Sequence, residues 1–162
     1  MRTQTTESLP NNLGSVTELL NYFVSVRAKT LDLCSPLETE DFGVQPMADA
    51  SPPKWHLAHT TWFFEAFLLK VYKENFQPFH ETFGYLFNSY YIRAGHPFPR
   101  SDRGNLSRPT VKEVMQYRTE TESKVIDLIT DLERFDQKSK QEILTIIFSG
   151  WKSVMPQVLP GS

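Results

Sequence analysis

Apolar side chains recur every three or four residues along four stretches of the chain, a spacing that places them on one face of a helix. The first stretch begins at Ser15, because Ser15 and Glu18 have the spacing of a capping box, and it ends before Pro36. The second stretch starts at Ser51, with Pro52 at the first helical position, and runs to about Tyr72. We therefore predict an all-α fold.

Two further helices follow in the second half of the chain. Thr110 and Glu113 again have capping-box spacing, and the apolar face behind them extends to about Leu132. A fourth helix is expected from near Ser139 to Gly150, about half the length of the second and third. The predicted architecture is a four-helix bundle in which the fourth helix is short or incomplete.

Residues 73–109 contain several prolines and glycines, so we expect a long irregular loop between the second and third helices. A loop of that length in a small domain is usually functional, and its many rings indicate that it is packed down. We expect residues 1–14 to be a flexible amino terminus, residues 15–149 to be the helical domain, and residues 150–162 to be a divergent tail.

Composition narrows the function classes. The chain has 162 residues, of which 40% are hydrophobic and 22% charged, which is typical of one globular domain. Its net charge of -2 argues against nucleic acid and acidic membranes as partners, and no apolar run is long enough to cross a bilayer. Cys34 is the single cysteine, which excludes an internal disulfide and favours a cytoplasmic location.

His56 and His59 are the first candidates for chemistry. They are three residues apart on the second helix and can lean to the same side, and a neutral imidazole is a good ligand for iron, zinc or copper. The alternative is a buried histidine that bonds to a carbonyl or to an acid such as Glu65. No histidine follows His96.

The long loop is basic and ring-rich. Four of the eight arginines lie between Arg93 and Arg108, and Asp102 is the single acid among them. Arg100 and Arg103 can form a clamp for a carboxylate or phosphate; alternatively, they tie the loop to acids on the helices. Between Trp55 and Tyr91 lie 13 of the 21 aromatic rings, which fits a packed core better than a box for a cationic ligand.

Two long motifs resemble one known family. The stretch SPPKWHLAHTTWFFE, residues 51–65, looks like the signature helix of the DinB-like amino-terminal domain of ergothioneine-biosynthesis sulfoxide synthases. The motif NSYY, residues 88–91, the run PRSDRGNLSRPT, residues 99–110, and the segment ending in Tyr117-Arg118 resemble the same family. The similarity extends over about residues 15 to 148, and it implies a DinB-like four-helix bundle.

The resemblance implies an activity and a site. Such enzymes use non-haem Fe(II), held by three histidines, and O₂ to join the sulfur of γ-glutamylcysteine or cysteine to hercynine. The resemblance implies that His59 is one of the metal ligands. It also implies that Arg100 and Arg103 bind the carboxylates of the thiol substrate. The family's other two ligands, a histidine pair on the fourth helix, have no counterpart here, and neither has its carboxy-terminal domain related to formylglycine-generating enzymes.

We therefore expect weak iron binding, no catalytic residue and no activity from the chain alone, unless a partner chain supplies the missing domain and ligands. A second hypothesis is a non-catalytic helical interaction module, whose apolar faces, left open by a half-length fourth helix, would dock a partner. A third is a DinB-type metal-dependent thiol transferase, which the shortage of histidines also disfavours.

Overall fold

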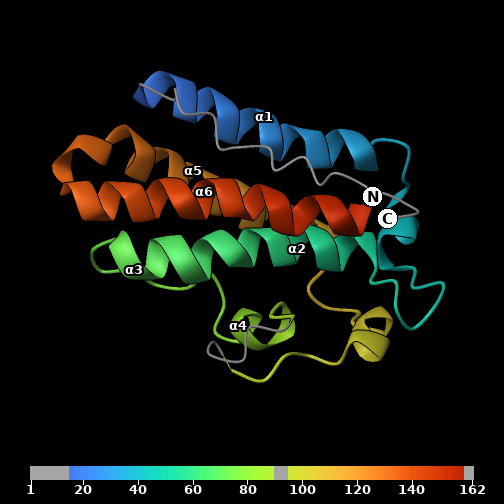
Figure 1. The fold of residues 1–162 in the computed structure, drawn as a ribbon. Helices are drawn as coiled ribbons and strands as arrows, with labels where there is room; N and C mark the ends of the chain where they lie inside the picture. Colours follow the sequence, from blue (N-terminus) through green and yellow to red (C-terminus); the bar gives the residue numbers. More distant parts are fainter. Residues whose placement is uncertain (1–14, 90–94, 159–162) are drawn as a thin grey trace, which may run out of the picture.

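A computed structural model describes the backbone of residues 15–89 and 95–158, and the side chains as far as Gly150. All regular structure in those ranges is helical, so the predicted all-α class is confirmed. Four long helical segments lie side by side, and the long loop lies along one side of α2 (Figure 1). The long segments are α1 (Val16–Cys34), α2 with its continuation to α3 (Pro53–Phe64, then Lys70–Tyr72), α5 (Val111–Thr130) and α6 (Gln137–Val158).

The helix starts follow the capping residues. The Ser15 hydroxyl accepts from the Glu18 amide at 3.2 Å, as expected for the start of α1. Thr110 and Glu113 form both bonds of the capping box, at 3.1 and 2.6 Å. The first helical residue of α2 is Pro53, one residue later than predicted. These caps satisfy amides that a helix start leaves without partners.

The helix from Pro53 to Tyr72 is continuous but not uniform. Residues Glu65–Leu69 form a π-helical turn, η2, between α2 and α3. An insertion of this kind shifts the side chains beyond it around the helix axis, and such turns are frequent at functional sites. Glu65, the first residue of the turn, is buried and accepts from the backbone amide of Phe79 in the loop that follows.

The prediction of a short fourth helix is wrong. Helix α6 has 22 residues and continues through Gly150 to Val158, so residues 150–158 of the predicted divergent tail are helical. Gly150 is a packing residue and not a helix stop, since a Cβ atom there would lie 2.5 Å from Cζ of Phe64. The Asp136 carboxylate accepts from the Ser139 amide at 2.7 Å and stabilises the start of the helix.

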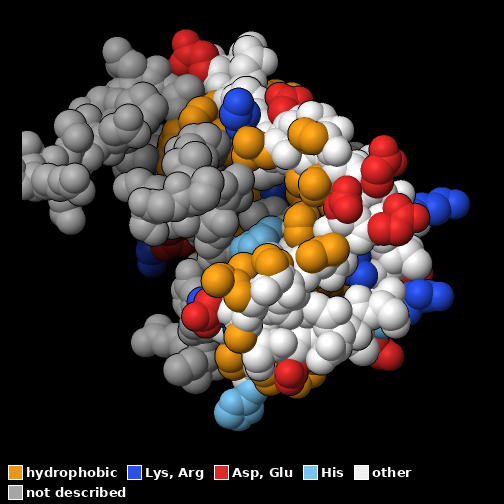
Figure 2. Space-filling view, turned by 90° about the vertical axis from the view of Figure 1, so that its right-hand side faces the viewer, with side chains coloured by type: hydrophobic (Ala, Val, Ile, Leu, Met, Phe, Trp, Pro, Cys, Tyr) orange, Lys and Arg blue, Asp and Glu red, His pale blue; other side chains and the backbone are white. Residues whose placement is uncertain are grey.

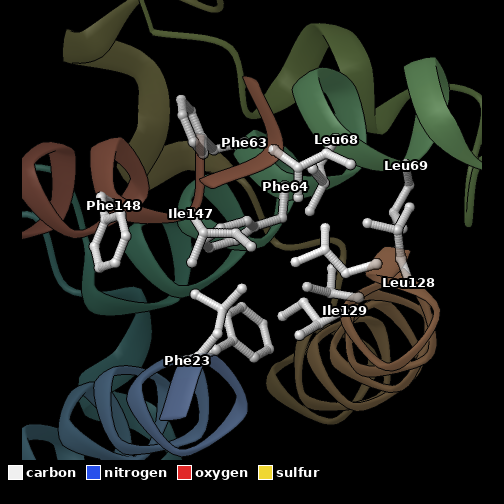
Figure 3. Close-up of a cluster of buried hydrophobic side chains, with 13 residues drawn as sticks. Phe23, Phe63, Phe64, Leu68, Leu69, Leu128, Ile129, Ile147 and Phe148 are labelled. Atoms are coloured by element: carbon white, nitrogen blue, oxygen red, sulfur yellow. The ribbon is translucent and has the colours of Figure 1, made fainter. Parts of the chain in front are cut away.

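Two hydrophobic clusters form the core. The first joins all four long segments (Figure 3), and it is here called the aliphatic cluster because nine of its 13 members are leucine, isoleucine or valine. The second, here called the ring cluster, joins α2 to α5, to the long loop and to Phe42 in the connection before α2. The aliphatic cluster contains Leu19, Phe23, Phe63, Phe64, Leu68, Leu69, Val125, Leu128, Ile129, Leu132, Ile143, Ile147 and Phe148. The ring cluster contains Phe42, Trp55, Leu57, Ala58, Trp62, Phe83, Phe87, Val114 and Tyr117.

The loop between α3 and α5 is irregular, as predicted, apart from short helical turns. In its described parts these are α4 (Phe83–Leu86) and the 3₁₀ turn η4 (Arg100–Asn105). Two further 3₁₀ turns, η1 (Thr39–Gly43) and η5 (Leu132–Arg134), connect the long helices elsewhere. The expected flexible residues 1–14 lie outside the described part of the chain. No helix within the described ranges is long and apolar enough to cross a bilayer.

Candidate functional site

The histidine assigned from the sequence lies in a stack of rings on α2. Trp55, His59 and Trp62 are spaced by four and three residues, so they share one face of the helix. The imidazole of His59 stacks on Trp55 with centroids 4.7 Å apart and planes 13° apart, and on Trp62 at 5.8 Å and 20°. With 1% of its surface exposed, His59 is part of the ring cluster's interior.

One hydrogen bond fixes the protonation of the His59 ring. Nδ1 lies 2.6 Å from the carbonyl oxygen of Phe87, at the end of α4. Because a carbonyl oxygen only accepts, Nδ1 carries the proton and Nε2 carries the lone pair. Trp55 donates from Nε1 to the neighbouring Leu86 carbonyl at 2.9 Å. Two side chains of α2 therefore bind the successive carbonyls of Leu86 and Phe87 at the end of α4. The neutral ring is therefore in the tautomer that a metal ligand binding through Nε2 requires.

The surroundings also keep the ring neutral. Burial lowers the pKa of His59 from 6.5 to about 4, and the positive charges of His56 and Arg103 act in the same direction. The bond to Phe87 opposes this shift but is outweighed. At neutral pH, His59 therefore carries no proton on Nε2.

Arg103 lies against the same stack. Its guanidinium carbon is 3.5 Å from the centroid of the Trp55 ring, a close cation–π contact. Nη1 donates to the Ser51 hydroxyl at 2.9 Å, Nη2 donates to the Phe98 carbonyl at 3.4 Å, and Nε is buried without a partner. Burial and the charge of Arg100 lower the pKa of Arg103 to about 10, so it remains a cation at neutral pH. A buried cation with an unused N–H group is suited to bind an anionic group.

Gln45 holds the turn that carries both arginines. Its side-chain amide donates to the Arg100 carbonyl at 2.8 Å and accepts from the Gly104 amide at 2.6 Å. Residue 104 has to be glycine for this contact, since a Cβ atom there would lie 2.7 Å from the Gln45 side chain. The guanidinium of Arg100 is exposed, unlike that of Arg103. The two predicted substrate-binding arginines therefore share one turn but not one environment.

The other histidines do not join His59 in a ligand group. His56 meets Trp55 edge-on at 5.6 Å, His80 is exposed and stacks on Phe83, and His96 is exposed. Among residues 15–89 and 95–150, no three His, Cys, Asp or Glu side chains are placed to hold one metal ion. Figure 2, which looks at the end of the bundle where α2 begins, shows a patch of histidine surface beside hydrophobic side chains. The described residues thus do not fit a three-histidine iron centre.

The sequence did not reveal a buried acid–phenol pair beneath the loop. The Tyr117 hydroxyl donates to Oε1 of Glu65 at 2.9 Å, and the Phe79 amide donates to Oε2 at 3.2 Å. Burial raises the pKa of Glu65, although both donors oppose the rise. Burial and the Glu65 charge raise the pKa of Tyr117 well above 10, so the phenol stays a donor. Tyr117 belongs to one of the motifs that resemble the family, but nothing in the spacing of the sequence pairs it with Glu65.

A buried pair of arginines links α1, α2 and α5. Arg27 donates to Glu122 at 2.8 Å and to the hydroxyls of Thr60 and Thr61 at 3.1 and 2.8 Å. Arg118 lies 3.1 Å from the same Glu122 oxygen and donates to the Arg27 carbonyl at 3.0 Å. Arg27 falls four residues after Phe23 on the buried face of α1, which is the signal that could have identified it. The cluster braces the bundle beside the site.

A pocket of about 290 Å³ lies at the other end of the bundle, where α3 ends. Its charged side chains include both signs, and Arg134 and Asp131 within it are 3.9 Å apart. None of His59, Arg100 and Arg103 lines it. The pocket is therefore separate from the ring stack and does not enlarge the candidate site.

Comparison with known proteins gives the family. The family model described as the DinB superfamily matches residues 22–146, from the first helix to the middle of the fourth. No curated protein sequence matches the chain. The matched range includes the ring stack, the long loop and the buried arginines. The chain therefore belongs to the DinB superfamily.

Proposed function

We propose that this chain is the DinB-like domain of an ergothioneine-biosynthesis sulfoxide synthase and contributes part of that enzyme's site. The observation that carries the proposal is the ring stack: His59 presents an unprotonated Nε2, and the buried cation Arg103 lies on the same Trp55 ring. Both groups fall within the two motifs that resemble the family. Their roles would be those of a single metal ligand and an anchor for the carboxylate of the thiol substrate.

The chain on its own is proposed to be inactive. Oxygen chemistry at non-haem iron requires a fixed ligand set that leaves open positions, and one imidazole does not define such a set. Among the described residues His59 has no two further side chains placed to complete a metal site, so the remaining ligands would have to come from outside these residues. Fe(II), hercynine and a thiol such as γ-glutamylcysteine or cysteine are the cofactor and substrates that the proposal implies.

Anion binding at Arg103 tests the substrate part of the proposal. We expect isothermal titration calorimetry with γ-glutamylcysteine to show binding that the Arg103→Ala variant weakens about tenfold or more, the scale of one charge-assisted hydrogen bond. Arg134→Ala, an exposed arginine in the pocket at the other end, is the matched control. Equal affinities for the wild type and Arg103→Ala would remove the anchoring role.

A turnover assay tests the rest. The purified chain is mixed with Fe(II), O₂, hercynine and γ-glutamylcysteine, and the sulfoxide is sought by mass spectrometry. We expect none at enzyme-like rates. Product formed by the chain alone would refute the single-ligand account.

The alternative of a non-catalytic interaction module loses its original support. It depended on apolar faces left open by a short fourth helix, whereas α6 is full length and buries Ile143 and Ile147 in the aliphatic cluster. The geometry at His59 and Arg103 favours a role in a site.

A further inference from the structure

We propose that Tyr117 and Glu65 are positioning residues for His59: their buried hydrogen bond holds the long loop so that the Phe87 carbonyl fixes the imidazole tautomer. The inference rests on the proposed function only for the statement that His59 binds a metal through Nε2; the contacts that position the ring do not depend on it. It depends on contacts that link α5, the π turn, the loop and α2.

The first step is the attachment of the loop to the helix. Glu65 accepts from two directions, from the Tyr117 hydroxyl on α5 and from the backbone amide of Phe79 in the loop. A buried carboxylate without such donors costs several kcal/mol, so the loop amide is strongly held in place. The π turn that begins at Glu65 is the local distortion at which this attachment is made.

The second step is transmission along the loop. The ring of Tyr117 packs against Phe79 at 5.1 Å and Phe83 at 4.9 Å. Phe83 in turn packs against Phe87 at 5.1 Å, and the Phe87 amide donates to the Phe83 carbonyl at 3.1 Å. This short turn, α4, ends in the carbonyl that accepts from Nδ1 of His59. Tyr117 thus contacts the start of this segment directly and is linked to Phe87 through Phe83.

The third step is the consequence for the ring. Which imidazole nitrogen carries the proton is decided by the bond that the other nitrogen makes. With the Phe87 carbonyl in place, the proton stays on Nδ1 and the lone pair on Nε2. If the loop shifts, that preference is lost, and the tautomer with the proton on Nε2, which cannot bind a metal through that atom, becomes populated.

The variant Tyr117→Phe isolates the hydroxyl, because the ring and its packing against Phe79 and Phe83 are retained. Its matched control is Tyr72→Phe, which removes a hydroxyl that also donates to a carboxylate, that of Glu142, at the far end of the helix. Glu65→Gln is a second variant, since the neutral amide keeps an acceptor for the Phe79 amide. Circular dichroism and thermal melts establish that all three are folded.

The ¹⁵N chemical shifts of the His59 ring at neutral pH report the tautomer directly. We expect the wild type and Tyr72→Phe to have the proton on Nδ1, and Tyr117→Phe to show a mixture of the two tautomers, with Glu65→Gln between them. A folded Tyr117→Phe protein with the wild-type tautomer would overturn the inference. If Tyr117→Phe does not fold, the same criterion applies to Glu65→Gln.

Titration with Zn²⁺ separates this inference from the proposed function. We expect zinc to perturb Nε2 of His59 in the wild type, and Tyr117→Phe to weaken that binding in proportion to the fraction of the protein that loses the tautomer with the proton on Nδ1. If zinc leaves His59 unperturbed in the wild type while Tyr117→Phe still changes the tautomer, the ligand role fails and the positioning role stands. If zinc binds equally well to both proteins, the positioning role fails.

Discussion

The two halves of the core have different compositions and different tasks. The aliphatic cluster joins all four long segments, and leucine, isoleucine, valine and phenylalanine make up all of it. The ring cluster contains two tryptophans, three phenylalanines and a tyrosine. Buried polar side chains lie against it, among them Lys54, His59, Glu65 and Arg103. The members of the first cluster need no polar partners, and the buried cation Arg27 lies over its Phe64 ring, whereas the second cluster surrounds several polar groups that water would otherwise solvate.

The difference shows which part of the core includes the free-energy cost of burying polar groups. Burying a methyl group stabilises the fold without a partner, but a buried polar group requires a hydrogen bond or a charge. Lys54 donates to the Leu106 carbonyl at 2.8 Å and His59 bonds to Phe87, while Arg103 keeps one N–H group without a partner. Ser89 and Arg118 also have a buried polar atom without a partner, and at Arg103 the proposed anionic ligand accounts for the unused N–H group.

Removing volume from the aliphatic cluster should have the largest effect on stability. Ile129 has no exposed surface, so Ile129→Ala is expected to lower the free energy of unfolding by about 4 kcal/mol, through lost burial and the cavity it leaves. Urea denaturation measures this. The ¹⁵N shifts of His59 should not change, and a change in them would mean that the two halves are not independent.

Neutralising the acid between the halves should cost somewhat less. Glu122 is the carboxylate shared by Arg27 and Arg118. In Glu122→Gln the two buried guanidinium groups lose that charge, and we expect a loss of about 3 kcal/mol. Glu133→Gln, which removes a carboxylate bonded to Lys140 near the surface, is the control. Similar losses in both variants, measured by urea denaturation, would argue against the buried cluster as a brace.

Acid should destabilise the ring cluster in particular. The pKa of His59 is about 4 in the folded protein and 6.5 when the ring is exposed, so the unfolded chain binds the proton more readily. Stability due to the neutral ring is complete above pH 6.5 and is lost as the pH falls to about 4, by about 3 kcal/mol in all. His59→Asn keeps a donor for Phe87 but does not titrate, so its unfolding free energy should fall less steeply over that range. Parallel pH profiles for the two proteins would contradict the assignment.

A helix cap should give the smallest effect. The Thr110 hydroxyl accepts from the Glu113 amide at the start of α5, outside both clusters. Thr110→Ala is expected to cost about 1 kcal/mol. Thermal unfolding followed by circular dichroism measures the loss, and Thr110→Ser, which retains the acceptor, should restore most of it. A serine variant as unstable as the alanine one would show that the hydroxyl is not what matters.

Much of the fold could be predicted because its signals are local. The caps at Ser15 and Thr110 and the apolar periods of α1, α2 and α5 depend on residues a few positions apart, and the structure bears them out. The end of α6 depends on tertiary packing instead. Gly150 reads as a helix stop in isolation, and its role becomes clear only when the ring of Phe64 lies against it.

The site could be predicted only in part, for the same reason. The spacing of Trp55 and His59 placed both on one helical face, and the structure stacks them. The carbonyl that selects the His59 tautomer comes from Phe87, 28 residues further along the chain, and the partner of Glu65 is Tyr117, 52 residues away. Contacts of this kind leave no periodic trace in a sequence. The ligand role of His59 and the substrate roles of Arg100 and Arg103 remain predictions.

Metal stoichiometry tests the central claim most directly, namely that the chain supplies a single metal ligand. The wild type, His59→Asn and His56→Asn are dialysed anaerobically against Fe(II), and bound iron is measured by elemental analysis. We predict weak binding of less than one iron per chain, lost in His59→Asn and retained in His56→Asn. One tightly held iron per chain, unaffected by His59→Asn, would contradict the account.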